Sequence, residues 1–162
     1  MTPRTPGASA ARPPGAARGA RGGEPTIPPV PGVPLLVAGP FARLPARAVA
    51  SAIASGLRAG GWAEADVCGL EDGLGEPDFD ARMRRARAVV IAQRRLTQAA
   101  LRGSAAFEIA TRARQAGVPC FAVTARNGLS ALDARILDLQ LVLEAGDLVA
   151  LDAAGRRLAE HL

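Results

Sequence analysis

Residues 88–92 read AVVIA, an unbroken apolar run with Arg87 before it and Gln93-Arg94-Arg95 after it. A strand that is apolar on both sides must be covered on both sides, as the central strand of a parallel sheet is. Four other short runs of the chain are rich in apolar residues: 34–38 (PLLVA), 65–70 (ADVCGL), 120–124 (CFAVT) and 141–143 (LVL). We therefore expect five strands.

Segments with helical periodicity separate these runs. In residues 46–58, apolar side chains recur every four positions from Val49 to Leu57. Further helices are predicted over residues 79–87 with Asp78 as N-cap, from Ser104 as N-cap to Gly117, over residues 133–140 and over residues 147–162. This alternation predicts a three-layer α/β/α domain with a mainly parallel sheet of about five strands, of the flavodoxin or Rossmann type.

The first 33 residues differ in composition from the rest. They hold eight of the 13 prolines and six of the 18 glycines, with four arginines against one glutamate. So few large apolar side chains cannot offset the entropy of ordering a backbone, about 1–2 kcal/mol per residue. We predict a disordered tail over residues 1–33 and one domain over residues 34–162.

The charge pattern does not favour a nucleic-acid partner. The net charge is +5, and the predicted domain is nearly balanced, with 16 arginines against 14 acidic residues. The arginine cluster of residues 82–87 is interpreted as the solvent face of a short helix. Because no run approaches the ~20 apolar residues that span a bilayer, and no secretory signal is visible, we predict a soluble cytoplasmic protein without a membrane partner.

Cys68 and Cys120 each lie within an apolar run, which favours buried free thiols over a disulfide. No histidine or further cysteine accompanies them, so the sequence offers no metal site of this kind. His161 is the single histidine and stands next to the last residue. Histidine-based acid–base catalysis is therefore not predicted.

Loops at the carboxyl ends of the predicted strands are where a parallel sheet binds ligands. This sequence places Gly39-Pro40, Asp72-Gly73, Gln93-Arg94-Arg95 and Arg126-Asn127 there. Arginines gathered at one edge favour a carboxylate or phosphate anion. The alternative is that these arginines are solvated loop residues.

Two stretches of the chain resemble bacterial type-I glycerate kinases. Residues 46–73 resemble the amino-terminal part of that family, and residues 78–146 resemble its carboxyl-terminal part. Within the second stretch the matching segments are DFDAR (78–82), LRGS (101–104), ARQAGVP (113–119) and ARILDLQ (134–140). Members of the family are roughly twice as long, with another domain inserted, so the two parts meet here near residues 71–77.

The resemblance implies ATP-dependent phosphorylation of glycerate, with ATP and Mg²⁺ as cofactors if the activity is retained. Several family motif residues differ here: the GEGxxD segment corresponds to Ala92, Gln93, Arg94 and Thr97, and the lysine of LxGK to Ser104. Asp72 is a weak candidate for a catalytic carboxylate. No metal ligands are assigned.

The candidate residues for binding substrate or phosphate are Arg95, Arg102, Gly103, Ser104, Arg126 and Asn127. Three functions stay open. The first is a shortened glycerate kinase, whether active or a pseudoenzyme, and the second is a non-catalytic module that binds glycerate or a phosphate compound. The third is an interaction subunit whose protein partner supplies the missing domain.

Overall fold

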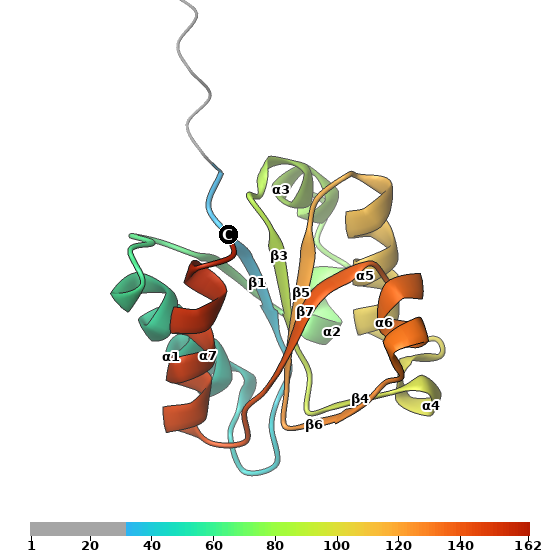
Figure 1. Cartoon of the computed structure of the whole chain (residues 1–162). Helices are drawn as coiled ribbons and strands as arrows, with labels where there is room; N and C mark the ends of the chain where they lie inside the picture. Colours follow the sequence, from blue (N-terminus) through green and yellow to red (C-terminus); the bar gives the residue numbers. More distant parts are fainter. Residues whose placement is uncertain (1–31) are drawn as a thin grey trace, which may run out of the picture. The chain divides into compact units, whose positions relative to one another are not determined.

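The sheet at the centre of the domain holds five parallel strands (Figure 1). The computed structural model describes residues 32–162, so the tail predicted over residues 1–33 lies outside the described residues except for its last two. The strands are β1 (Leu35–Ala38), β2 (Asp66–Gly69), β3 (Val89–Ala92), β5 (Cys120–Thr124) and β7 (Leu139–Glu144). Their spatial order is β2-β1-β3-β5-β7, the 2-1-3-4-5 order of flavodoxin-like folds. The predicted fold class is confirmed.

Side chains alternate between the two faces of the sheet, and each face has its own core. On β1, Leu35 and Val37 belong to one core, while Leu36 belongs to the other. β3 divides its side chains in the same way, and none of its residues is more than 1% exposed. This burial on both faces explains why residues 88–92 contain no polar side chain.

Helices cover both faces of the sheet (Figure 1). One face carries α1 (Ala46–Ala59) and α7 (Leu148–Ala159). The opposite face carries α2 (Leu70–Gly73), α3 (Phe79–Arg85), α4 (Gln98–Leu101), α5 (Ala105–Gln115) and α6 (Ala131–Ile136). Among these helices, α4 lies beside the carboxyl edge of the sheet, whereas α3 lies at the amino edge (Figure 1).

α1 and α7 approach each other closely enough for their backbones to touch. A Cβ atom added to Gly56 would lie 1.9 Å from the Asp152 carbonyl oxygen, and one added to Gly155 would lie 2.2 Å from the Ile53 oxygen. Both distances are far below van der Waals contact. The absence of a side chain at these two positions therefore sets the spacing of the two helices.

Polar side chains cap the starts of α4, α5, α6 and α7, and one predicted cap is wrong. The Ser104 hydroxyl accepts a hydrogen bond from the Phe107 N–H (3.2 Å), and Asp147 accepts one from the Ala150 N–H (2.8 Å). Asp78 stands before α3, but its side chain accepts no capping bond there. Its φ and ψ of −101° and 3° depart from the extended backbone that N-cap residues normally adopt.

The helix predicted over residues 133–140 starts and ends earlier than expected. Ser130 and Asp133 form a reciprocal capping box, so α6 starts at Ala131. The chain leaves the helix before Asp138, which has a φ of +55°, and β7 begins at Leu139. The apolar residues that suggested the end of a helix therefore belong to a strand.

Arg82 does not lie on a solvent face, contrary to the interpretation of the 82–87 cluster. Its side chain is 15% exposed, and its Nε and Nη2 atoms donate to the Asp66 carboxylate at 2.9 and 2.7 Å. It also forms an ion pair with Glu76. The hydrogen bond to Asp66 raises the pKa of Arg82. This ion-pair network ties α3 to the edge strand β2.

Cys68 and Cys120 are buried free thiols, which confirms the prediction. Burial raises the pKa of Cys68 to about 11 and that of Cys120 to about 12. Since the thiolate is the reactive form, neither sulfur is suited to nucleophilic chemistry at neutral pH. Within residues 32–162, the structure contains no helix with the length and apolar character needed to cross a membrane.

Candidate functional site

The carboxyl edge of the sheet brings together the segments that follow β1, β3 and β5. The order of the strands changes direction between β1 and β3, and folds of this type bind ligands beside such a point. Gly39, after β1, donates its N–H to the Ala92 oxygen at the end of β3 (2.8 Å). Gln93 in turn donates its N–H to the Val123 oxygen of β5 (3.0 Å). Backbone bonds therefore hold the three strand ends in fixed positions.

Two short strands that were predicted as loops extend this edge. β4 (Arg95–Thr97) pairs in parallel with β6 (Arg126–Gly128), with Arg95 directly opposite Arg126 (Figure 1). Paired strands lie about 4.8 Å apart, and residues in register project to the same face. The structure therefore brings together the two arginines nearest the strand ends among the predicted anion-binding residues.

The contact between Thr97 and Gly128 shows on which face of the β4–β6 ladder Arg95 and Arg126 lie. A Cβ atom on Gly128 would lie 2.9 Å from the Thr97 methyl group, so the two positions face the same side. Leu96, between Arg95 and Thr97, is 2% exposed and packs into the core on the other side. Because side chains alternate along a strand, Arg95 and Arg126 lie on the open face, and both are exposed.

The two guanidinium groups have no acidic partner within residues 32–162, where the five salt bridges all involve other arginines. Like charges placed directly opposite each other on neighbouring strands destabilise a sheet. A pair of this kind is stabilised when an anion binds between the two charges, and arginine is well suited to bind carboxylate or phosphate oxygens.

Thr124 holds the two arginine-bearing segments together from within the sheet. Its side chain is fully buried, and the hydroxyl oxygen lies 3.1 Å from both the Arg94 and the Arg126 carbonyl oxygens. The hydroxyl donates to one of them and accepts from the Arg126 N–H at 3.3 Å. Thr124 therefore fixes the register in which the two arginines meet.

Glu144 is the acidic residue closest to this ladder in the hydrogen-bond network. Its carboxylate accepts the Asn127 N–H at 2.7 Å and so supports the backbone of β6. The Asn127 side chain is used locally, since its Oδ1 accepts the Leu129 N–H at 3.1 Å. Asn127 therefore shapes the turn after β6, and Glu144 offsets part of the positive charge of the site.

Arg102, Gly103 and Ser104 lie in the turn between α4 and α5, away from the arginine pair. The Ser104 hydroxyl donates to the Leu101 oxygen (2.9 Å) while it caps α5, so both of its bonds serve the turn. Gly103 has a φ of +68°. Arg102 lines a different hollow, of about 190 Å³, between α4, α5 and α6.

Asp72 lies in α2, after the edge strand β2. Two strand spacings separate β2 from β3, which is about 10 Å across the sheet. The structure therefore does not bring this carboxylate to the arginine pair.

The carboxyl edge does not fit the Mg²⁺–ATP complex that the family resemblance implies. Mg²⁺ is usually held in such sites by one or two carboxylates together with the phosphates. Here Glu144 and Asp147 accept backbone N–H groups, and Asp72 stands apart. Within residues 32–162, no group of three or more His, Cys, Asp or Glu side chains is arranged to hold a metal ion.

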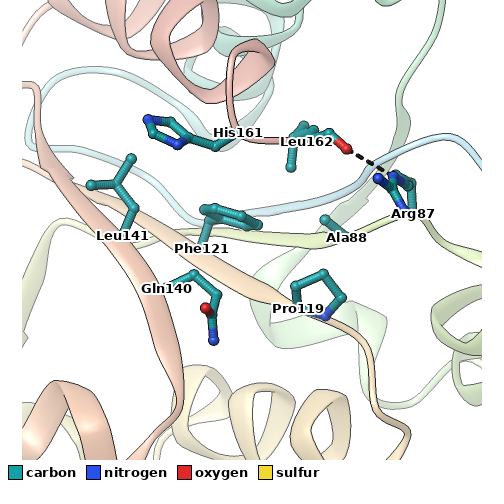
Figure 2. Close-up of a pocket in the computed structure, with 8 residues that line it drawn as sticks. All are labelled: Arg87, Ala88, Pro119, Phe121, Gln140, Leu141, His161 and Leu162. Atoms are coloured by element: carbon teal, nitrogen blue, oxygen red, sulfur yellow. Dashed lines mark hydrogen bonds between the residues drawn. The ribbon is translucent and has the colours of Figure 1, made fainter.

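A second hollow, of about 320 Å³, lies at the opposite, amino edge of the sheet (Figure 2). Phe121 and Ala88 form its floor, and His161 lies above them near Leu162. Arg87 donates its Nε–H to the Leu162 backbone oxygen at 2.7 Å. Because none of the predicted site residues lines this hollow, and strand ends bind ligands at the other edge, we favour the carboxyl edge.

Sequence reasoning did not select Gln93, Thr124 or Glu144 as parts of the site. Gln93 lies in one of the loops selected at the strand ends, but nothing in the sequence indicated that its side-chain oxygen is buried. Thr124 is the last residue of the apolar run 120–124. A hydroxyl side chain at the end of a strand that is otherwise apolar was the signal that could have found it. Glu144 is the last residue of β7, and the register of this strand was not predictable from the sequence.

The chain matches no protein-family model and no curated protein sequence. Several solved structures have similar backbones, and three of them are described here. A diflavin flavoprotein from Nostoc sp. is 14% identical, with a TM-score of 0.49 over 81% of this chain and 92% of that chain. A putative pilus assembly-related protein from Burkholderia pseudomallei is 21% identical, with a TM-score of 0.43 over 79% and 90%. The flavodiiron protein from Giardia intestinalis is 13% identical, with a TM-score of 0.48 over 80% and 35%.

These three structures assign no function to this chain, and the fold class follows from its own strand order. The resemblance to glycerate kinases stays a prediction.

Proposed function

We propose that this chain is a shortened, cytoplasmic member of the glycerate kinase family that binds a small carboxylate or phosphate anion without turning it over. The anion lies at the carboxyl edge of the sheet, between Arg95 and Arg126. The observation that carries the proposal is the register of β4 and β6, which sets these two arginines opposite each other. The arrangement is unfavourable for the free protein and favourable once a negative charge is bound.

We favour binding over phosphoryl transfer because the carboxyl edge lacks carboxylates that are available to bind Mg²⁺. Transfer of a phosphoryl group relies on Mg²⁺ and cationic side chains to neutralise charge in the transition state. This edge supplies cationic side chains, but its carboxylates accept hydrogen bonds from backbone N–H groups. A coupled assay for ADP release with D-glycerate, ATP and Mg²⁺ tests this step. Turnover above the no-glycerate control would overturn the non-catalytic assignment.

Binding itself is tested by thermal shift with D-glycerate and with inorganic phosphate, since a ligand that binds the folded state raises the melting temperature. The double variant Arg95→Ala/Arg126→Ala is expected to lose the shift. The matched control is Arg58→Ala/Arg157→Ala, which removes the same charge from the last turns of α1 and α7. It should keep the shift. A shift that both variants retain, or the absence of any shift in the natural chain, would refute the proposal.

A partner chain that supplies the missing central domain is the second candidate. A wide apolar hollow of about 570 Å³ favours it, lined by Phe41 and Leu44 and by the start of α7. There Val149 is 81% exposed and Leu148 is 47% exposed. Exposed apolar surface of this kind marks a contact with another protein. Light scattering that shows only monomers at high concentration, and no complex after coexpression with a candidate partner, would count against this role.

A further inference from the structure

The sheet has two outer strands, β2 and β7, whose free edges differ. Asp66 of β2 donates its N–H to the Pro34 oxygen beside β1 (2.9 Å), so the next residue, Val67, turns its backbone groups outward. The Arg82 side chain, which bonds Asp66, also donates to the Val67 oxygen at 3.4 Å. Because charged side chains at an edge discourage another strand from pairing there, the edge of β2 is protected.

The free edge of β7 is open. Ala145, just after the strand, donates its N–H to the Thr124 oxygen of β5 (2.8 Å), so Glu144 and Val142 turn their N–H and C=O groups away from β5. Within residues 32–162, no backbone hydrogen bond joins β7 to a segment other than β5. Figure 1 shows β7 in front of the other strands, with α7 and α6 to its sides and no helix across it. The strand reads LQLVLE, without proline, lysine or arginine to shield the edge.

The side chains of β7 restrict how a second strand can pair with this edge. The strand pairs regularly with β5 from Leu141 to Glu144. Leu141 and Leu143 pack into the core under α1 and α7, whereas Val142 packs against the core on the opposite face. Residues opposite each other in an antiparallel pair project to the same face. If the second strand is β7 of another copy, the twofold axis must therefore pass through a residue and not between two residues.

Charge distinguishes the three central residues through which this axis can pass. An axis through Leu141 sets Asp138 opposite Glu144 of the second copy, and like charges opposite each other destabilise a strand pair. An axis through Leu143 sets Glu144 opposite Val142, so a carboxylate meets an apolar side chain. Both of these registers are unfavourable.

An axis through Val142 makes the edge complementary to itself. The two Val142 residues then exchange backbone hydrogen bonds, and Leu141 lies opposite Leu143 of the second copy. Gln140 lies opposite Glu144, so its carboxamide N–H groups face a carboxylate acceptor. Both of these polar side chains are exposed in the single chain. The backbone groups, the apolar side chains and the charge of the edge therefore all match a second copy of the same strand.

We propose that this chain forms a homodimer through β7, in which two copies pair antiparallel around Val142 and continue one sheet across both molecules. The occupant of the edge is a second copy because β7 complements its own sequence in this register. Pairing also satisfies the outward backbone groups of the open edge. Dimerisation of this kind does not depend on anion binding at Arg95 and Arg126.

Sedimentation velocity over a concentration series tests the dimer with the full chain. The natural chain should form a dimer with a measurable dissociation constant. Gln140→Glu sets like charges opposite each other at two places across the axis, so dimerisation should weaken about fivefold. Gln140→Lys sets a cation opposite Glu144 and should strengthen dimerisation by a similar factor. Gln115→Glu, at an exposed position of α5, should leave the dissociation constant unchanged.

Oxidative cross-linking tests the register. In the Val142→Cys variant the two introduced thiols lie opposite each other with Cα atoms about 5.5 Å apart, which is within reach of a disulfide. Gln140→Cys is the control, because its two copies are four residues out of register, about 13 Å apart. The natural thiols of Cys68 and Cys120 are buried and do not compete. A covalent dimer should form with Val142→Cys and not with Gln140→Cys.

Several outcomes would overturn the proposal. A natural chain that stays monomeric at every concentration would do so, as would a dimer whose dissociation constant ignores the charge at position 140. Cross-linking through Gln140→Cys, or none through Val142→Cys, would exclude the register around Val142. Val149→Arg tests the hollow at the start of α7, where Val149 is 81% exposed. If that variant abolished the dimer while Gln140→Glu left it intact, the contact would belong to the hollow and not to β7.

Discussion

The contact between α1 and α7 offers a direct test of the packing, through the substitution Gly56→Ala. The added Cβ would lie 1.9 Å from the Asp152 oxygen and 2.8 Å from the Arg156 nitrogen, both of them backbone atoms. A side chain could rotate away, but a helix backbone must move as a unit. To restore ordinary contact, the two helices have to separate by about 1.5 Å, which loosens the core between them.

The size of the effect follows from two opposing contributions. Overpacking of this kind costs about 1–3 kcal/mol, and contact with backbone on the far side places Gly56→Ala at the upper end. Alanine recovers about 1 kcal/mol because it favours a helix more than glycine does. The net loss in the free energy of unfolding is therefore about 2 kcal/mol. For a domain of this size that lowers the melting temperature by roughly 8 °C.

Denaturant titration and calorimetry measure this loss, and Gly146→Ala is the matched control. A Cβ on Gly146 meets no atom within 4 Å. The free energy of unfolding of the Gly146→Ala variant should therefore stay within about 0.5 kcal/mol of that of the natural chain. Gly155→Ala should resemble Gly56→Ala, and the double variant should cost less than the sum, because both open the same contact. A Gly56→Ala protein as stable as the natural chain would refute the backbone contact.

Three further results are expected. Arg82→Met leaves two half-buried carboxylates without their partner, so denaturant titration should show a loss of about 2 kcal/mol; a loss below about 0.5 kcal/mol would mean that the ion pairs are fully screened. Cys68 and Cys120, whose pKa values burial raises to about 11 and about 12, should resist a thiol reagent at pH 8 until the protein is unfolded, and rapid labelling of the folded protein would contradict their burial. Ligand-free Arg126→Ala should gain a few tenths of a kcal/mol at low salt, and less at 0.5 M salt where repulsion is screened; an equal gain at both would point to a cause other than charge.

The main strands and helices were predictable because their signals are local. Each of these elements carries the pattern of its burial in its own residues. Examples are the apolar run of residues 88–92 and the helical spacing of apolar residues from Val49 to Leu57. The central strands are buried on both faces, so their unbroken apolar composition predicts them as strands. The start of α6 was placed two residues late because the capping box begins at Ser130, ahead of the predicted Asp133.

The site was only partly predictable because its geometry depends on contacts between distant segments. β4 and β6 have three residues each, and Arg95 meets Arg126 only through the pairing of β3 with β5. No local preference places two like charges opposite each other. Ser104 shows the converse difficulty, since serine at a helix start suits both a cap and a phosphate site, and the structure commits its hydroxyl to the cap.

Amide chemical-shift mapping by NMR tests the location of the anion site most directly. On addition of D-glycerate or phosphate, we predict that the largest shifts fall on the backbone amides of Arg95 and Arg126, which lie opposite each other on β4 and β6. The amides of Arg87 and His161, at the opposite edge, should not move. Shifts that gather around Arg87 and His161, or no shifts at all, would contradict the assignment of the carboxyl edge as the binding site.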